Sequence, residues 1–295
     1  MIETKLTIKD YNSEEKPTWC PGCGDFGILN AVKMALLQAD IAPHQVFITS
    51  GIGCGSKLPH YLKSNGFHTL HGRSLPIATG IRLANHNLKM LVVHGDGDGY
   101  GMGLGHMLHA IRRNVNLVDL VQNNQVYGLT KGQYSPTSEQ GYISKTSPEG
   151  TVEAAVNPLA LAISAGATFV ARGFSGDPKH LAELIRQALE HPGYALVDVL
   201  QPCVTFNKVN TYDYYRDRVY KVEEQNGYDS ADPVAAFEKA LEWGDRIPIG
   251  LIYHGPAQPT FEEQTTVLAA GPLVKQPLEN RFSEEHMDAL RAEFF

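Results

Sequence analysis

Residues 91–138 read LVVHGDGDGYGMGLGHMLHAIRRNVNLVDLVQNNQVYGLTKGQYSPTS, and this stretch decides the fold. It opens with an apolar run at residues 91–93, which predicts a buried strand. A glycine-rich turn at residues 95–99 follows, then helical spacing at residues 103–113 and a second apolar strand at residues 116–121. Two strand ends joined by one helix are typical of an open α/β sheet, in which ligands bind outside the carboxyl ends of the strands.

Oxygen donors follow both of these expected strands. Asp96 in the first turn offers a carboxylate, Asn124 after the second strand offers an amide oxygen, and Val126 offers a backbone carbonyl. Hard oxygen ligands of this kind suit Mg²⁺ that holds a diphosphate. The neighbouring glycines let backbone N–H groups approach phosphate oxygens without a side-chain clash. The stretch therefore predicts a magnesium and diphosphate site, and the alternative is an ordinary glycine-rich turn beside an asparagine-rich one.

The alternation of strands and helices continues on both sides of this stretch. Strands are expected at residues 45–49, 168–171 and 195–200, and helices at residues 28–39, 77–85, 154–165 and 177–190. This order predicts βαβ units, hence an α/β fold with a mainly parallel sheet and helices on both faces. We expect one α/β domain at residues 1–210. Residues 211–295 are expected to form an extension or arm that packs on this domain or on a partner subunit.

Composition limits the class of protein. The chain has 295 residues, of which 43% are hydrophobic and 19% charged, as in soluble globular proteins. It contains no run of about 18 apolar residues and no apolar signal core near the start, so we expect no membrane span and a cytoplasmic location. The net charge of −7 argues against a nucleic-acid-binding surface.

The chain has four cysteines, each in a glycine- or proline-flanked loop or at a strand end: Cys20, Cys23, Cys54 and Cys203. Disulfides are not expected in a cytosolic chain. Four thiolates suit a structural Zn²⁺ or a 4Fe–4S cluster, and spacing alone does not separate these. A thioredoxin-like C-x-x-C pair, or plain burial of some cysteines, also stays open. Residues 22–27 fit G-x-G-x-x-G, but no strand precedes them, so we reject a dinucleotide-binding fingerprint.

Taken together, the motifs resemble the β subunit of the 2-oxoacid:ferredoxin oxidoreductases, which are thiamine diphosphate (ThDP) enzymes. The matching motifs are WCPGCG at residues 19–24, GC at 53–54, HGR at 71–73, GDGD at 95–98, NN at 123–124, YGLTKGQ at 127–133, SPT at 135–137 and QPC at 201–203. They cover roughly residues 18–209 and are far more specific together than any one of them is alone. The resemblance implies the pyrophosphate-binding type of ThDP domain.

By this resemblance, the chain would take part in converting a 2-oxoacid and coenzyme A (CoA) into an acyl-CoA and CO₂, with two electrons passing through a 4Fe–4S cluster to ferredoxin. Asp96, Asn124 and the Val126 carbonyl would hold Mg²⁺, and the four cysteines would hold the cluster. Residues that match the family's ThDP contacts are Ile52, Gly53, Cys54, Gly55, His71, Gly97, Asp98, Gly128 and Leu129. Asp25 would approach the aminopyrimidine of ThDP.

Substrate and partners follow from the same resemblance. Lys57 and Lys131 lie near the expected cofactor site, where a lysine would pair with the distal carboxylate of 2-oxoglutarate; pyruvate or a broad range of 2-oxoacids is the alternative. The activating carboxylate of ThDP must come from another domain, so we expect a larger α subunit and an α2β2 heterotetramer. A charged segment of this chain contains Lys208, Arg216, Arg218 and Lys221. Ferredoxin would dock on this basic patch, or the segment would instead pack on the partner subunit.

Two other classes of function stay open at this point. A non-redox ThDP decarboxylase or carboligase would explain Asp96 and Asn124 but would leave the cysteines without a role. A zinc-stabilised scaffold subunit would use the cysteines structurally and would leave the GDG turn idle. Zinc is redox-inert, so only an iron–sulfur cluster would accept electrons beside ThDP.

Overall fold

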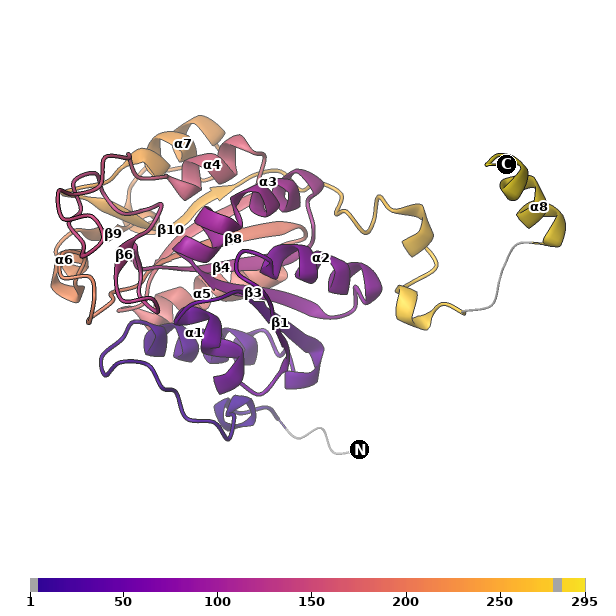
Figure 1. Ribbon diagram of the computed structural model, residues 1–295, viewed down its shortest axis with the longest axis horizontal. Helices are drawn as coiled ribbons and strands as arrows, with labels where there is room; N and C mark the ends of the chain where they lie inside the picture. Colours follow the sequence, from indigo (N-terminus) through magenta and orange to yellow (C-terminus); the bar gives the residue numbers. More distant parts are fainter. Residues whose placement is uncertain (1–4, 278–282, 295) are drawn as a thin grey trace.

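The computed structural model describes residues 5–277 and 283–294 (Figure 1). Within these ranges a central sheet has eight strands in the order β2-β1-β3-β4-β8-β7-β10-β9. All neighbouring strands run parallel except β10, which is antiparallel to β7. The bounds are β1 (Val46–Ser50), β2 (Asn65–His68), β3 (Lys89–Gly95), β4 (Leu117–Asn123), β7 (Phe169–Phe174), β8 (Tyr194–Leu200), β9 (Val219–Lys221) and β10 (Ile247–His254). The predicted mainly parallel sheet is confirmed.

Helices cover both faces of this sheet, as expected (Figure 1). One face carries α1 (Asp25–Gln38) and α5 (Pro178–Glu190), and the other carries α2 (Ser74–Ala84), α3 (Leu104–Arg113), α4 (Pro158–Ser164) and α7 (Pro233–Leu241). Side chains alternate between the faces with period two. On β4, Val118 and Leu120 join the core beneath α1 and α5, while Leu117 and Val121 join the core beneath α2 and α3. Burying each such side chain contributes about 1.5–3 kcal/mol.

Local signals explain where several elements begin. α4 starts at Pro158 and not at residue 154 as expected, because the Asn157 side chain caps it by accepting the N–H of Ala160 and proline occupies the first helical position. A π-helical turn, η4 (Gly97–Met102), lies between β3 and α3. A two-stranded ribbon of β5 (Val126–Tyr127) and β6 (Gln133–Tyr134) follows β4, and the sequence did not predict it.

The segment after residue 210 adds to the sheet. α6 (Tyr212–Arg216) leads into β9, and β10 pairs with both β9 and β7. Part of the expected arm is therefore part of the sheet, and the domain boundary at residue 210 stays a prediction. α7 packs against α4, and its buried Ala240 joins the core of that face.

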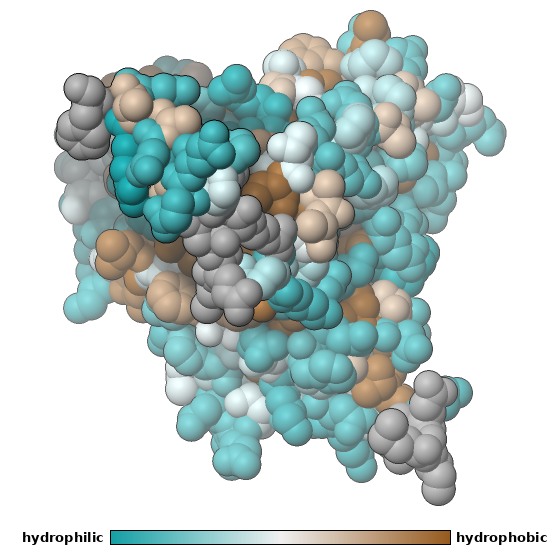
Figure 2. Space-filling model, turned by 90° about the vertical axis from the view of Figure 1, so that its right-hand side faces the viewer, coloured by the Kyte–Doolittle hydropathy of each residue, from teal (hydrophilic) through white to brown (hydrophobic). Residues whose placement is uncertain are grey.

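The chain beyond β10 runs along the face that carries α2 and α3. The Arg82 Nε of α2 contacts Glu262 Oε1 at 2.6 Å, and both side chains are buried. α8 (Glu284–Ala292) lies apart from the body of the molecule in Figure 1. Figure 2 shows that the surface on this side is mainly hydrophilic, with hydrophobic residues in several separate groups. No helix in the described ranges is both long and apolar enough to cross a membrane.

Candidate active site

The carboxyl ends of β1, β3 and β4 meet at one edge of the sheet, and a pocket opens there. Every residue expected to contact Mg²⁺ or ThDP, apart from Asp25, lines this pocket: Ile52, Gly53, Cys54, Gly55, His71, Asp96, Gly97, Asp98, Asn124, Val126, Gly128 and Leu129. Parallel strands end at the same edge, so turns that are distant in sequence come together. We call this space the diphosphate pocket.

Asp96 follows β3 and lines the diphosphate pocket. Its side chain is buried, and burial raises the pKa of its carboxyl to about 6, although hydrogen bonds from Ser135 and Thr137 oppose the shift. The Asn124 Oδ1 accepts the N–H of Val126 at 3.1 Å, which fixes the turn after β4. Asp96, Asn124 and Val126 thus line one space, and the carboxylate, amide and carbonyl oxygens that they carry suit a hard divalent cation.

Asp98 ties together three loops around the diphosphate pocket. Its Oδ1 accepts the N–H of Ile52 at 2.8 Å and that of Gly72 at 2.9 Å, and lies 2.7 Å from His71 Nδ1. Its Oδ2 lies 3.2 Å from Nδ1 of the buried His94. Burial alone would raise the pKa of Asp98, but His94 and the N–H groups of Ile52 and Gly72 hold it below its usual value. Asp98 is therefore an anionic anchor of the pocket walls.

His94 lies behind Asp98, between two carboxylates. Its Nε2 is 2.6 Å from Asp119 Oδ1, and Asp119 also accepts the hydroxyl of Tyr194 at 2.5 Å. Burial lowers the pKa of His94, but the charges and hydrogen bonds of Asp119 and Asp98 outweigh it and raise the pKa to about 10. A protonated imidazole therefore joins the pocket to the middle of the sheet.

A second cavity, of about 220 Å³, lies next to the diphosphate pocket, and all four cysteines line it. Cys54 and Gly128 border both spaces. A Cβ placed on Gly128 would lie 3.7 Å from Cys203 Sγ and 3.8 Å from Cys54 Sγ, so these two sulfurs flank the same glycine. We call this space the cysteine cavity.

Several contacts order the walls of the cysteine cavity. The Trp19 indole N–H donates to the Cys54 carbonyl at 2.7 Å, and the Gln201 amide donates to Cys23 Sγ at 3.3 Å. Burial, and then the nearby Asp25, raise the pKa of the Cys23 thiol far above its usual value and that of Cys54 to about 11. Buried thiolates need a compensating cation, and metal binding would displace their protons. The donor set thus fits a thiolate-bound metal group.

In the described ranges no three His, Cys, Asp or Glu side chains are arranged to hold a single metal ion. All four cysteines are free, with Cys20 exposed, Cys23 buried, and Cys54 and Cys203 half-buried.

Known proteins resemble this chain over most of its length. The family model "Thiamine pyrophosphate enzyme, C-terminal TPP binding domain" matches residues 40–199, and the model of the C-terminal part of the pyruvate ferredoxin oxidoreductase β chain matches residues 203–270. The β subunit of 2-oxoacid:ferredoxin oxidoreductase 1 from Aeropyrum pernix is 48% identical over 266 residues, covering 87% of this chain and 84% of that relative. The chain belongs to the β subunits of the 2-oxoacid:ferredoxin oxidoreductases.

Two further relatives agree with this assignment of the β subunit. Subunit KorB of the 2-oxoglutarate oxidoreductase of Mycobacterium tuberculosis is 46% identical over 219 residues, covering 72% of this chain and 58% of that relative. A chain of the solved 2-oxoglutarate:ferredoxin oxidoreductase of Magnetococcus marinus, with 2-oxoglutarate, coenzyme A and succinyl-CoA bound, superposes with a TM-score of 0.89. It is 42% identical, and the match covers 97% of this chain and 96% of that one. The resemblance seen in the sequence is confirmed.

Three residues expected at the site lie outside the diphosphate pocket of the β subunit. Lys57 is half-buried and lines the cysteine cavity. Asp25 is buried beside Cys23 in the same cavity, and burial raises the pKa of its carboxyl to about 7. Lys131 is exposed, two residues after Leu129, with a backbone φ of 82°. The structure brings Asp25 and Lys57 to the cysteines, whereas Lys131 lines neither the diphosphate pocket nor the cysteine cavity.

The four cations expected to form a basic patch each have a local partner. Lys208 donates to the Val204 carbonyl, Arg216 pairs with Asp213, Arg218 lies over the Tyr214 ring, and Lys221 pairs with Asp177. Docking of ferredoxin at these residues stays a prediction.

Tyr127, Ser135 and Thr137 shape the site, but no role was predicted for them from the sequence, although they belong to the YGLTKGQ and SPT motifs. The Tyr127 ring lies against Gly97, and its hydroxyl donates to the Gly97 carbonyl at 3.0 Å. Ser135 and Thr137 bond Asp96, although the sequence points to them only through the SPT motif. Contacts between loops distant in sequence have no periodic signal, so no other feature of the sequence could have directed attention to them.

Proposed function

We propose that this β subunit provides the diphosphate-binding half of a ThDP site, holds a 4Fe–4S cluster, and takes part in oxidative decarboxylation of a 2-oxoacid. The observation that carries this proposal is the shared wall between the diphosphate pocket and the cysteine cavity, formed by Cys54, Asn124, Gly128 and Leu129. Electron transfer between two groups needs such proximity. The most suitable substrate is 2-oxoglutarate, which with CoA would give succinyl-CoA, CO₂, a proton and two electrons for ferredoxin.

The residues around each space have distinct roles in this proposal. Asp96, Asn124 and the Val126 carbonyl would hold Mg²⁺, which neutralises the diphosphate of ThDP. Asp98 keeps the loops at Ile52 and Gly72 in place beside it. When bound, ThDP supplies the carbon nucleophile for decarboxylation of a 2-oxoacid, and the cluster supplies an acceptor for single electrons. The chain contributes the residues that hold and orient both groups.

An iron–sulfur cluster is favoured over structural zinc for two reasons. The four cysteines surround a cavity of about 220 Å³ beside the diphosphate pocket, which leaves room for a group larger than one ion. The reaction named for the relatives is an oxidation that uses ferredoxin, and zinc cannot accept electrons.

An α subunit is the partner that this proposal requires. ThDP enzymes need a carboxylate that activates the aminopyrimidine, and that carboxylate belongs to a pyrimidine-binding domain. The described part of this chain is organised around one central α/β sheet, with the diphosphate pocket at its edge. Asp25 lies at the cysteine cavity and stays a weaker candidate for contact with the aminopyrimidine.

The substrate is proposed from two lysines and two relatives. Lys57 lines the cysteine cavity, and Lys131 lies two residues after Leu129 of the diphosphate pocket. In this proposal, one of these lysines would pair with the distal carboxylate of 2-oxoglutarate. The names of KorB and of the Magnetococcus enzyme include 2-oxoglutarate. A family model named for pyruvate enzymes matches residues 203–270, so pyruvate is the competing substrate.

The test is anaerobic turnover of the complete complex with ThDP, Mg²⁺, CoA and ferredoxin. We expect reduction of ferredoxin with 2-oxoglutarate at a higher kcat/KM than with pyruvate. Lys131→Ala should raise KM for 2-oxoglutarate more than for pyruvate, because only the former has a distal carboxylate. Equal effects on both substrates would remove the lysine from the proposal, and absence of ferredoxin reduction with any 2-oxoacid would refute the function.

A further inference from the structure

The carboxylate of Asp96 has two hydroxyl partners that no role yet accounts for. Ser135 Oγ donates to Asp96 Oδ2 at 2.5 Å, and Thr137 Oγ1 donates to the same oxygen at 2.6 Å. All three side chains are at least 97% buried. A hydrogen bond to a charged oxygen in a buried place is among the stronger ones in proteins. The backbone N–H of Asn124 is a further hydrogen-bond partner of this carboxylate, so donors from the loop at residues 135–138 and from the turn after β4 together set its orientation.

The two hydroxyl groups are themselves held in place. Ser138 Oγ donates to the Gln125 carbonyl at 2.6 Å and accepts the N–H of Ser135 at 2.8 Å. These bonds fix the loop of residues 135–138 to the turn after β4. The same turn carries Asn124 and Val126, so the loop and the oxygen donors form one unit.

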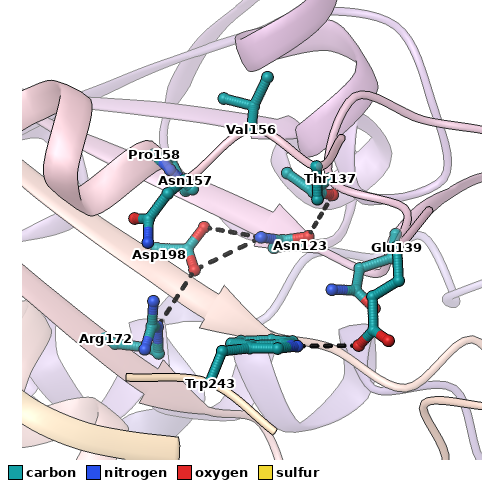
Figure 3. Close-up of a pocket in the computed structure, with 11 residues that line it drawn as sticks. Asn123, Thr137, Glu139, Val156, Asn157, Pro158, Arg172, Asp198 and Trp243 are labelled. Carbon is teal, nitrogen blue, oxygen red and sulfur yellow. Dashed lines mark hydrogen bonds and ion pairs between the residues drawn. The ribbon is translucent and has the colours of Figure 1, made fainter. Parts of the chain in front are cut away.

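A buried polar chain supports Thr137 from behind, as Figure 3 shows. Thr137 Oγ1 lies 2.9 Å from Asn123 Oδ1, and Asn123 Nδ2 donates to Asp198 Oδ1 at 3.1 Å. Asp198 Oδ2 lies 3.9 Å from the Arg172 Nε. Asn123 must direct its amide N–H toward Asp198, which leaves its oxygen facing Thr137. The chain therefore fixes the position of the Thr137 hydroxyl, whose proton Asp96 and Asn123 share.

We propose that Ser135 and Thr137 are positioning residues that orient Asp96 for binding Mg²⁺ with its diphosphate. Hydrogen-bond partners of a metal-binding carboxylate set its rotation, because a carboxylate without them would rotate between several geometries. This inference rests on the proposed function, since it assumes that Asp96 holds the metal. It assigns a role to the SPT motif at residues 135–137. The expected contacts with ThDP do not include this motif.

The experiment measures the Mg²⁺ concentration needed for ThDP binding by the complete, ThDP-depleted complex, using titration calorimetry. Thr137→Val keeps the shape and removes the hydroxyl, and Ser135→Ala removes the other donor. We expect each to raise the Mg²⁺ requirement roughly 10- to 100-fold. Thr137→Ser keeps a hydroxyl and should restore most of the affinity. Thr146→Val is the control, because this exposed hydroxyl lies outside the loop of residues 135–138 and, within the described residues, its side-chain hydrogen bond is to Ser144.

Iron content and circular dichroism report whether each variant is folded. An Mg²⁺ requirement of Thr137→Val and Ser135→Ala within twofold of the wild type, at unchanged iron content, would overturn the inference. A Thr137→Ser variant as weak as Thr137→Val would also overturn it, because loss of packing would then explain both. If the wild-type complex bound no ThDP in the presence of Mg²⁺, the proposed function itself would be refuted. This outcome differs from failure of the inference alone, in which the wild type binds ThDP and the variants match it.

Discussion

Asp98 is the residue on which the loops of the diphosphate pocket depend. It accepts N–H groups from Ile52 and Gly72, two residues far apart in the chain, and it contacts two histidines. A buried carboxylate is costly unless its oxygens are hydrogen-bonded, and here the partners satisfy both oxygens. The space that Asp98 occupies exists because residue 51 has no side chain: a Cβ on Gly51 would lie 1.9 Å from Asp98 Oδ2.

Gly51→Ala should therefore disrupt the site, although the substitution adds only one methyl group. The new methyl group must displace the Asp98 carboxylate, and overpacking of this kind costs about 1–3 kcal/mol. We expect a lower free energy of unfolding and weaker ThDP binding, measured by urea unfolding and calorimetry. Gly80→Ala is the matched control, because Gly80 lies on an exposed position of α2 with no atom near its Cβ. Equal effects of the two substitutions would contradict this account of Asp98.

The oxygen donors of the site could be predicted at the level of residue types, but their surroundings could not. Asp96 and Asn124 were identified because each follows an apolar run that ends in a turn. Asp98 was assigned only by resemblance, and its hydrogen bonds to Ile52 and Gly72 depend on three loops that meet in space. No local pattern encodes such a meeting, so the sequence alone could not reveal the anchor.

Whole elements were predicted well where hydrophobic periodicity was strong. β3, β4 and β8 were recognised because buried strands in a parallel sheet are apolar on both faces and so form continuous apolar runs. Each extends beyond the expected run by one or two residues at one or both ends. β2 and β9 were missed. All four residues of β2 are exposed, and β9 has three residues, so neither has the apolar run by which a buried strand is recognised.

The segment after β10 is attached to α2 by a buried ion pair, and this attachment is testable. Glu262→Ala would leave the buried Arg82 guanidinium without its carboxylate partner, and breaking a buried pair costs about 3–5 kcal/mol. We expect a clear fall in the urea midpoint of unfolding. Glu238→Ala, on an exposed position of α7, should change the midpoint little. If both variants unfolded at the wild-type midpoint, the pair would not anchor this segment.

The free energy of unfolding should depend on pH through His191. This residue directly follows α5, and its Nε2 lies 2.8 Å from the Thr168 hydroxyl beside β7. Burial, and then the nearby His254, lower the pKa of His191 to about 4. In the unfolded chain this imidazole titrates at about 6.5, so the unfolded state binds more protons between these values. Its contribution to stability is therefore present above about pH 6.5 and is lost as the pH falls towards 4, by up to about 3 kcal/mol.

His191→Gln should remove this part of the pH dependence. The urea midpoint of the wild type should fall more steeply between pH 7 and pH 5 than that of the variant. The exposed His44 provides the control, because His44→Gln should retain the wild-type slope. A His191→Gln variant with the same slope as the wild type would contradict the account.

At the scale of the whole molecule, the proposed function makes this chain the diphosphate-binding half of a site that a second chain would complete. Its pocket and cysteine cavity lie side by side at one edge of a single sheet. The isolated β subunit should therefore show no turnover of 2-oxoacids, while the complex with its α subunit should be active. Adding the α subunit to the purified β subunit should restore activity, as measured by ferredoxin reduction. Full activity of the β subunit alone would refute the need for a partner.

The central claim is that the four cysteines hold an iron–sulfur cluster next to the ThDP site. The most direct test compares iron and acid-labile sulfide per β subunit in the anaerobically purified complex with the same complex carrying Cys20→Ser and Cys23→Ser. Clusters elsewhere in the complex cancel in this difference. We expect the wild type to contain about four more iron and four more sulfide atoms per β subunit. Zinc without sulfide in the wild type, or equal iron in both complexes, would contradict the account.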